Sequence, residues 1–346
     1  MQTNPIKTRM AIKAKGLRIA CLLSALMIIF SVPVSAAGPE NELTLIPGGM
    51  TFGAKLAYPA VMITELDLDP ECPAAAAGLA VGDMIISVNG IKTTDPVQLT
   101  ETVEKAGGEP LTVEFERDGK RQSTTIVPRS VNGKYRIGIT VRNSSAGIGT
   151  VTFITSNGEF GGLGHGICCK ENGKLAPLTD GYVCGVDIKG IKKGNAGEPG
   201  EIRGTFCNAR LGRISANTAC GVFGLYAVAP ESPREPMPVA ALQDVKVGSA
   251  TVISTLGDDG PKEYGIEITT VFEPRGGSEK GFAIKVTDPA LLERTGGIVQ
   301  GMSGSPIIQD GKLVGAVTHV MINDPTCGYG IFITTMLEKM PELLKP

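Results

Sequence analysis

The chain has 346 residues, 42% of them hydrophobic, and a formal net charge of −2 at pH 7; this length suggests two domains or three small ones. It contains no Trp and only 5% aromatic residues, so platforms that stack nucleic-acid bases are not expected. Its 46 glycines and 23 prolines separate β-branched runs, which favours many short strands joined by tight turns and thus a mainly β fold.

The N-terminus has the order of regions that is typical of an export signal. Five basic residues come before an apolar run from about Ile19 to Val34, and the small residues Ser35 and Ala36 follow. We therefore predict that residues 1–36 are a signal peptide or an N-terminal membrane segment, and that the rest of the chain is exported across the cytoplasmic membrane. Without this segment the formal net charge changes from −2 to about −7, because five positive and no negative charges are lost. An acidic exported protein is a poor partner for nucleic acid.

Seven cysteines follow the predicted signal, and no two of them have the C-x-x-C spacing. An odd number of cysteines without that spacing indicates neither a disulfide framework nor a zinc ribbon. We expect no metal and no cofactor.

Residues 43–128 are predicted to form a small α/β domain. A helix should begin at Pro96, with Asp95 as its cap, and end near Gly107. Alternating apolar residues predict strands on either side of it, with a hairpin turn at Asn89-Gly90.

This domain resembles a PDZ domain. The resemblance is carried by the run Gly82-Asp83-x-Ile85-Ile86-x-Val88-Asn89-Gly90, the helical segment Pro73 to Leu79, and the motif Gly49-x-x-Phe52-Gly53. PDZ domains add an extended peptide to a sheet edge and hold its carboxylate with backbone N–H groups. The resemblance implies a peptide-binding loop at Gly49, Phe52 and Gly53. The alternative is a groove that stays empty or holds the chain itself.

Residues 129–346 are predicted to form the second domain. After a connector at residues 129–150, short strands, glycines and turns dominate, and no long helical periodicity occurs before Met336. This pattern suggests a β-barrel or paired barrels. His165, one of only two histidines, lies in a glycine-rich strand end, where it is either catalytic or simply well packed.

The segment from Gly301 to Pro306, with the sequence GMSGSP, has the features of a nucleophile turn. Its glycines allow backbone angles that a Cβ would forbid, and consecutive N–H groups in such a bend can form an oxyanion hole. An ordinary glycine-rich turn is the alternative. The turn is followed by a strand, a hairpin turn and a returning strand that ends at His319. This order is similar to that of the closing elements of trypsin-like proteases. His165 before Ser303 matches the order of base and nucleophile in that clan.

These residue types define a mechanism. A serine hydroxyl needs a positioned imidazole to take its proton, and the imidazole needs an acceptor on its other nitrogen. We predict Ser303 as nucleophile, His165 as base, and the N–H groups of Gly301 and Ser303 as the oxyanion hole. The acid is left open, because six aspartates lie between His165 and Ser303: Asp180, Asp187, Asp244, Asp258, Asp259 and Asp288. Asp288 could also cap a short helix that ends at Gly296.

The order of a PDZ-like domain and these motifs resembles the SpoIVB peptidase family (stage IV sporulation protein B) over roughly residues 43–345. The matching stretches are GLGH at 162–165, TDP at 287–289, TGGIVQGMSGSP at 295–306 and AVTHV at 316–320. The resemblance implies an exported serine peptidase with a triad of His165, Asp288 and Ser303. It also implies action between the two membranes around a forespore, cleavage of a regulator of a membrane-embedded protease with activation of a late sigma factor, and self-cleavage.

His319 lies on the returning strand, which forms one wall of the primary specificity pocket in trypsin-like folds. It is either a packed strand histidine or a residue that helps to select the side chain before the scissile bond, since imidazole can hydrogen-bond polar or acidic groups. The second interpretation predicts an altered substrate preference in His319→Ala.

The sequence thus predicts a mainly β protein in which a small α/β PDZ domain precedes a trypsin-like double β-barrel peptidase domain. The expected partners are a PDZ peptide ligand and a protein substrate, which the resemblance implies is a membrane-associated regulator of an intramembrane protease. Two alternatives are a quality-control protease of the HtrA type, although those usually place the PDZ domain after the protease, and a catalytically silent PDZ adaptor. Broad digestion of casein would favour the first alternative.

Overall fold

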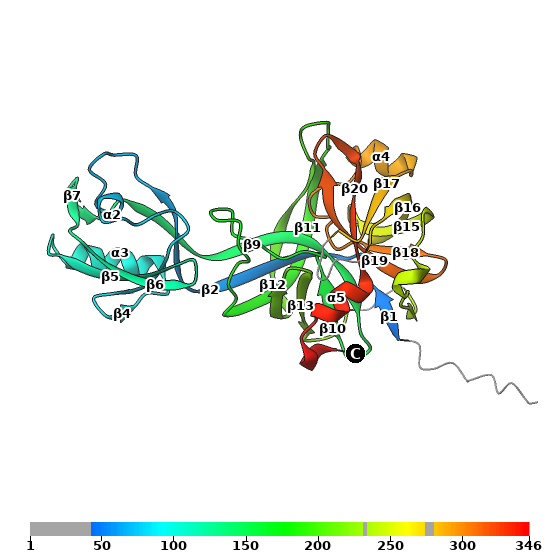
Figure 1. Cartoon of the computed structure of the whole chain (residues 1–346), viewed down its shortest axis with the longest axis horizontal. Coiled ribbons are helices and arrows are strands. Elements are labelled where there is room, and N and C mark those ends of the chain that lie inside the picture. Colours follow the sequence, from blue (N-terminus) through cyan, green and yellow to red (C-terminus); the bar gives the residue numbers. More distant parts are fainter. Residues whose placement is uncertain (1–42, 231–233, 274–279, 346) are drawn as a thin grey trace, which may run out of the picture. The chain divides into compact units, whose positions relative to one another are not determined.

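The computed structural model describes residues 43–230, 234–273 and 280–345 (Figure 1). The predicted signal segment lies outside the described residues. Within them, four hydrophobic cores form: one in each of two β-barrels, one in the PDZ-like part, and one that includes Phe153, Phe223, Ile331 and Met336. No helix in the described ranges is long and apolar enough to cross a membrane.

The first barrel is a ring of six antiparallel strands. The pairings run from β2 through β9, β10, β13, β12 and β11 and return to β2. These strands are β2 (Thr51–Leu66), β9 (Ile139–Ile154), β10 (Glu159–Gly162), β11 (Asp180–Lys192), β12 (Glu201–Thr218) and β13 (Gly221–Tyr226). Phe52, Val151, Phe160 and Val183 fill its interior, because alternate residues of a strand point to the same face. β1 (Thr44–Pro47) extends this sheet by pairing with β9 and with β14 (Met237–Pro238).

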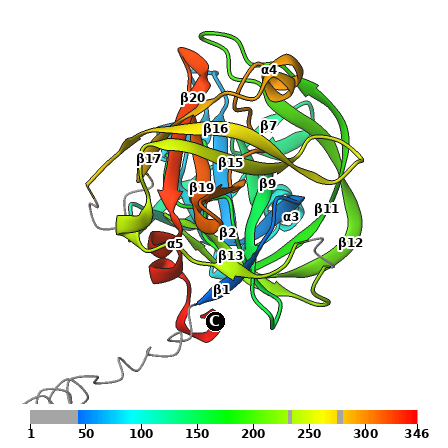
Figure 2. The same ribbon diagram turned by 90° about the vertical axis from the view of Figure 1, so that its right-hand side faces the viewer.

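The second barrel closes in the order β15-β16-β17-β20-β19-β18 (Figure 2). Its strands are β15 (Gly248–Thr255), β16 (Pro261–Val271), β17 (Phe282–Val286), β18 (Pro306–Gln309), β19 (Lys312–Met321) and β20 (Asp324–Phe332). Helix α4 (Pro289–Thr295) follows β17, helix α5 (Ile333–Lys339) follows β20, and short 3-10 turns cover Leu242–Asp244 and Glu342–Leu344. The predicted double β-barrel is therefore confirmed.

The PDZ-like part contains the helices and short strands between β2 and β9. They are α2 (Pro73–Ala76), β3 (Met84–Val88), β4 (Ile91–Lys92), α3 (Pro96–Lys105), β5 (Leu111–Arg117), β6 (Lys120–Ile126), β7 (Arg129–Val131) and β8 (Lys134–Arg136). Helix α3 begins as predicted, because the Asp95 side chain accepts a hydrogen bond from the N–H of Val97. It ends before Gly107, because the φ of +60° at Gly107 does not occur within a right-handed helix.

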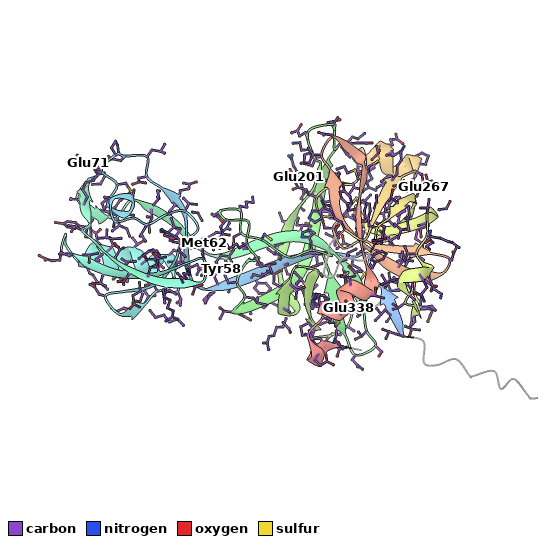
Figure 3. The ribbon with its side chains drawn as sticks, in the orientation of Figure 1. Tyr58, Met62, Glu71, Glu201, Glu267 and Glu338 are labelled. Atoms are coloured by element: carbon purple, nitrogen blue, oxygen red, sulfur yellow. The ribbon has the colours of Figure 1, made fainter. Side chains whose placement is uncertain are left out.

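The PDZ core does not precede the peptidase as a complete domain, and the boundary expected at residues 128 and 129 does not separate the two cores. Along β2, Tyr58 and Met62, both labelled in Figure 3, belong to the first-barrel core, whereas Val61 and Ile63 belong to the PDZ core. The register changes here, and Pro59, which has no N–H, lies in the unpaired stretch. The chain thus enters the PDZ core within β2 and returns within β9. The PDZ core is inserted between two neighbouring strands of the first barrel.

The peptide-binding loop expected at Gly49, Phe52 and Gly53 is also corrected. Phe52 is 2% exposed in the first-barrel core, and Gly53 pairs with Ile148 of β9 and Cys184 of β11. A Cβ on Gly49 would lie 2.5 Å from a methyl group of Ile253 in the second barrel. The motif therefore packs the peptidase barrels, where the small glycines permit close approach of neighbouring side chains.

Candidate active site

The turn around Ser303 joins α4 to β18 and depends on glycine at Gly301 and Gly304. Their φ angles are +100° and +93°, a region that residues with a Cβ rarely adopt. A Cβ on Gly304 would lie 2.1 Å from the carbonyl oxygen of Thr150 and 2.4 Å from the N atom of Leu163. The turn can therefore press against the first barrel only because glycine stands there.

Two buried threonines of β9 hold this turn. Thr150 donates from Oγ1 to the carbonyl of Gly301 at 2.7 Å, and its N–H donates to the carbonyl of Ser303 at 2.9 Å. Thr152 donates from Oγ1 to the carbonyl of Gly304 at 2.8 Å. Both side chains are fully buried, so these bonds are made without competition from water. The sequence prediction did not include these threonines; their signal is a pair of hydroxyls two residues apart, on the face of the strand opposite to the core residue Val151.

We expect Thr150→Val to impair catalysis as well as stability. Valine has nearly the same shape but leaves the buried Gly301 carbonyl without this donor, which costs about 1–3 kcal/mol. Because the Gly301 N–H is one of the two predicted oxyanion donors, we expect kcat to fall about 10- to 100-fold through its displacement. Thr155→Val is the matched control, since Thr155 is buried near the end of β9 but bonds to Glu159 instead. Equal kcat losses in the two variants would contradict this role of Thr150.

Two N–H groups of the turn are available for an oxyanion. Those of Met302, Gly304 and Ser305 donate to carbonyls within 3.0 Å. Within the described ranges, no acceptor is present for the N–H groups of Gly301 and Ser303. These are the two donors predicted from the sequence, and donors of this kind stabilise the charge that develops on the substrate oxygen.

His165 follows a sharp bend after β10. Leu163 and Gly164 both have a φ of +67°. Leu163 is one of the few described residues other than glycine that have a positive φ. The bend brings Gly164 against β19, where its Cβ would lie 3.0 Å from the Thr318 methyl group. His165 is half-buried, and its Nδ1 lies 2.9 Å from the carbonyl oxygen of Gly166.

The structure brings His165, His319 and Ser303 together on β19 and the loops beside it. The ring centroids of His165 and His319 are 5.1 Å apart, and the two planes are tilted by 35°. Ser303 Oγ donates to the carbonyl of Thr318, the residue before His319, at 2.9 Å. The Ser303 hydroxyl is thus hydrogen-bonded to the backbone of β19 in this structure.

Burial lowers the pKa of His319 to about 4, and the positive charges of His165 and Lys280 contribute in the same direction. The ring is therefore neutral at physiological pH. Below pH 6.5 the unfolded chain takes up a proton at His319 that the folded chain does not bind until about pH 4, so the associated stability is present above pH 6.5 and is lost as the pH falls to 4.

We expect the melting temperature of the wild type to fall more steeply between pH 7 and 4.5 than that of His319→Phe, which cannot titrate. Thermal unfolding at matched ionic strength measures the difference, because all other titrating groups are shared. Parallel pH dependences would contradict the depressed pKa of His319.

Asp288 lies at the start of α4. Its carboxylate accepts from the N–H of Leu291 at 3.0 Å and from the N–H of Gly265 at 3.3 Å. The helix ends at Gly296 with a φ of +73°, so the capped helix considered from the sequence is confirmed. In the described part of the structure, no hydrogen bond joins Asp288 to His165. Its assignment as the triad acid stays a prediction.

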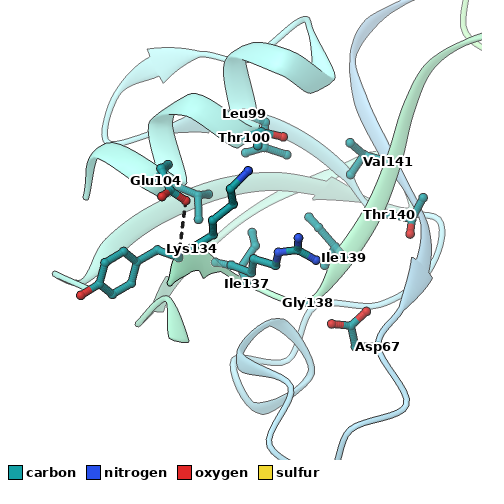
Figure 4. Close-up of a pocket in the computed structure, with 13 residues that line it drawn as sticks. Asp67, Leu99, Thr100, Glu104, Lys134, Ile137, Gly138, Ile139, Thr140 and Val141 are labelled. Atoms are coloured by element: carbon teal, nitrogen blue, oxygen red, sulfur yellow. Dashed lines mark hydrogen bonds between the residues drawn. The ribbon is translucent and has the colours of Figure 1, made fainter. Parts of the chain in front are cut away.

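The PDZ-like part has a groove between α3 and residues 134–141 (Figure 4). This cavity of about 350 Å³ is lined by apolar side chains and by charges of both signs, which include Leu99, Val103, Ile137, Ile139, Val141, Lys134, Arg136, Asp67 and Glu104. The Tyr135 N–H donates to Glu104 across it at 2.9 Å. Gly138 has a φ of +77°, and its Cβ would lie 2.7 Å from Cys72 Sγ. A strand edge facing a helix is where PDZ domains bind peptides, and the sequence prediction placed this groove at the wrong motif.

Two closed barrels, a serine in a glycine turn beside a histidine, and a PDZ domain define a trypsin-like serine peptidase with an inserted recognition module. A family model described as SpoIVB peptidase S55 matches residues 133–337, and a PDZ-domain model matches residues 66–117. The chain belongs to the SpoIVB peptidase family, so the resemblance inferred from the sequence motifs is confirmed.

Curated relatives share only a short segment with this chain. The zinc metalloprotease RasP of Geobacillus kaustophilus is 35% identical over 95 residues, which are 27% of this chain and 23% of that protein. The regulator of sigma-E protease RseP of Salmonella typhimurium is 41% identical over 86 residues, or 24% of this chain and 19% of that protein. The chain thus spans about a fifth of the length of these relatives. Its two histidines, His165 and His319, cannot form the H-E-x-x-H motif of zinc peptidases.

Solved structures give distant likenesses. The active form of the Rv3671c protease from M. tuberculosis is 15% identical, covers 56% of this chain and 73% of that chain, and has a TM-score of 0.35. Deg5 is 17% identical and covers 56% of this chain and 81% of that chain, with a TM-score of 0.33. The PDZ domain of an SdrC-like protein from Listeria monocytogenes is 21% identical and covers 25% of this chain and 90% of that chain, with a TM-score of 0.23.

Proposed function

We propose that this chain is an exported serine endopeptidase of endospore formation, which cleaves a regulator of a membrane-embedded protease and so leads to activation of a late sigma factor. Membership of the SpoIVB peptidase family supports the peptidase class and motivates the substrate. The observation that carries the proposal is that Ser303 bonds to Thr318 while His165 packs on His319, the next residue of β19. Among the described residues, two N–H groups of the Ser303 turn have no acceptor. The proposed place of action is the space between the forespore membranes.

Each residue has a stated role in this proposal. Ser303 attacks the substrate carbonyl, and His165 accepts the hydroxyl proton at Nε2 and later returns it to the leaving amine. The N–H groups of Gly301 and Ser303 hold the oxyanion, where the loss of one donor typically costs about 3–4 kcal/mol. Asp288 is the proposed acid of the triad, because each carboxylate oxygen that accepts from Leu291 or Gly265 can accept a second hydrogen bond.

The PDZ groove is proposed to capture an extended segment of the substrate or of a membrane partner. An added peptide strand would lie along Ile139 to Val141, and its terminal carboxylate would meet the N–H groups of Ile137 and Gly138, for which the described residues provide no acceptor.

Export and self-cleavage can be tested together by expressing the wild type and Ser303→Ala with their N-termini intact and sequencing the N-termini of the secreted chains. We expect both chains to begin after about residue 36, and shorter products to occur only in the wild type. Shorter products in both chains would contradict self-cleavage, and retention of both in the cytoplasm would contradict export.

Casein incubated with the wild type should stay largely intact, since general digestion of casein would favour a quality-control protease.

A further inference from the structure

A small hairpin begins two residues after His165. The Ala176 N–H donates to the Ile167 carbonyl at 2.8 Å, so residues 167–176 fold back on themselves. The Asn217 side chain of β12 binds the N–H of Ile167 and the carbonyls of Ile167 and Ala176, each at 2.9 Å. The base of this 167–176 hairpin is therefore fixed on the first barrel.

The His165 ring contacts the residue that leads into the hairpin. Its Nδ1 lies 2.9 Å from the carbonyl oxygen of Gly166, and the Gly166 N–H donates to the carbonyl of Ala219 at 3.2 Å. A Cβ on Gly166 would lie 2.1 Å from a methyl group of Leu175, on the returning arm of the hairpin. Because Gly166 packs this closely on the returning arm, a shift of the 167–176 hairpin would also move His165.

The outer part of the hairpin is held by the two strands that lead to the PDZ core. Glu171 accepts a hydrogen bond from Arg142 of β9, with 2.6 Å between Oε2 and Nη2, and its side chain is only 10% exposed. Cys169 Sγ lies 3.6 Å from the hydroxyl of Tyr58 on β2, and that hydroxyl also bonds to Ser145 of β9. The hairpin thus contacts both strands of the connection.

The ion pair between Arg142 and Glu171 is largely removed from water. Arg142 Nε is buried and has no acceptor among the described residues, so Glu171 is the carboxylate that compensates this guanidinium. Removal of one partner from such a pair leaves an uncompensated charge, which is costly. The hairpin has a second ion pair, from Lys174 to Asp118 in the turn after β5, but these side chains are 54% and 73% exposed. Exposed pairs of this kind contribute little.

We propose that Arg142 and Glu171 are positioning residues for His165, because their ion pair sets the place of the 167–176 hairpin that follows the base. This inference rests on the proposed function of His165 as general base. Arg142 directly follows Ile139 to Val141, the strand edge along which a peptide is proposed to bind. The PDZ part thus supports the catalytic base through the same strand that forms its groove.

The test measures kcat and KM on one peptide substrate with the full exported chain, at a temperature below the melting temperature of every variant. We expect Glu171→Ala to lower kcat about tenfold with little change in KM, because a displaced base slows the chemical step rather than substrate binding. Glu171→Gln should recover most of that loss, since its amide oxygen can still accept from Arg142. Asp118→Ala is the matched control on the same hairpin, and its kcat should stay within about twofold of the wild type.

A double-mutant cycle gives a second readout. Arg142→Met should lose about as much kcat as Glu171→Ala, and the double variant should be no slower than either single variant, because both changes remove the same contact. A purely structural role of the pair would lower the melting temperature and leave kcat unchanged.

Four results would overturn the inference. They are a kcat of Glu171→Ala within about twofold of the wild type, no recovery in Glu171→Gln, an equal loss in Asp118→Ala, and additive losses in the double variant. If the wild type neither cleaves the peptide nor reacts with a serine-directed probe, the proposed function itself fails. That outcome is distinct from the other four, because each of them requires an active wild type.

Discussion

Replacing His165 with alanine is expected to lower kcat by about 10⁴-fold or more, because loss of the base leaves the Ser303 hydroxyl without a proton acceptor. The ring is half-buried and its described hydrogen bond is to the adjacent carbonyl, so the fold should tolerate its removal. Steady-state cleavage of a peptide substrate measures the loss, and thermal unfolding should show little change.

The double variant His165→Ala/Ser303→Ala is the control for this prediction. Residues that act as one unit in catalysis are strongly non-additive, so the double variant should be no slower than either single variant. A His165→Ala enzyme that keeps more than about 1% of wild-type kcat, or additive losses in the double variant, would show that the two residues do not act together.

Gly304→Ala is expected to destabilise the protein and abolish cleavage together. The new methyl group would lie 2.1 Å from one backbone atom of the first barrel and 2.4 Å from another, and the φ of +93° disfavours any Cβ. We expect a loss of about 3 kcal/mol or more, since left-handed strain and overlap with rigid backbone add. Displacement of Leu163 would also move His165, so kcat should fall in the chains that still fold.

Gly311→Ala separates strain from overlap. Gly311 has a similar φ of +75° in the turn after β18, but its Cβ would meet nothing within 4 Å. The free energy of unfolding of this variant should therefore fall by only about 1 kcal/mol, which is the cost of the backbone conformation, and its activity should be kept. Equal melting temperatures for the two alanine variants would contradict the tight contact between the Ser303 turn and the first barrel.

Local signals account for what the sequence predicted well. A serine between glycines needs positive φ angles on both sides, and Asp95 before Pro96 is a complete helix start, so both could be read without knowledge of the fold. The two-barrel class and the family are confirmed for the same reason, because they rest on glycine-bearing motifs of fixed order.

The predictions that failed needed long-range information. The Gly49-x-x-Phe52-Gly53 motif fits a peptide loop and a barrel strand equally well, and only the partners of Phe52 decide between them. The insertion of the PDZ core was hidden because β2 and β9 are continuous strands that serve two cores. The hydrogen bond from Thr150 to the Gly301 carbonyl could not be predicted either, because the acceptor of a buried hydroxyl is known only from the folded structure.

The proposed peptidase activity depends most directly on Ser303 as an activated nucleophile. Reaction of the purified exported chain with a fluorophosphonate probe, followed by mass spectrometry of the peptide that contains residues 301–306, tests this claim in one measurement. We predict a covalent adduct on Ser303, no adduct on the fully buried Ser305, and no labelling of Ser303→Ala. Absence of an adduct in the wild type, an adduct on another residue, or labelling that persists in Ser303→Ala would contradict the account.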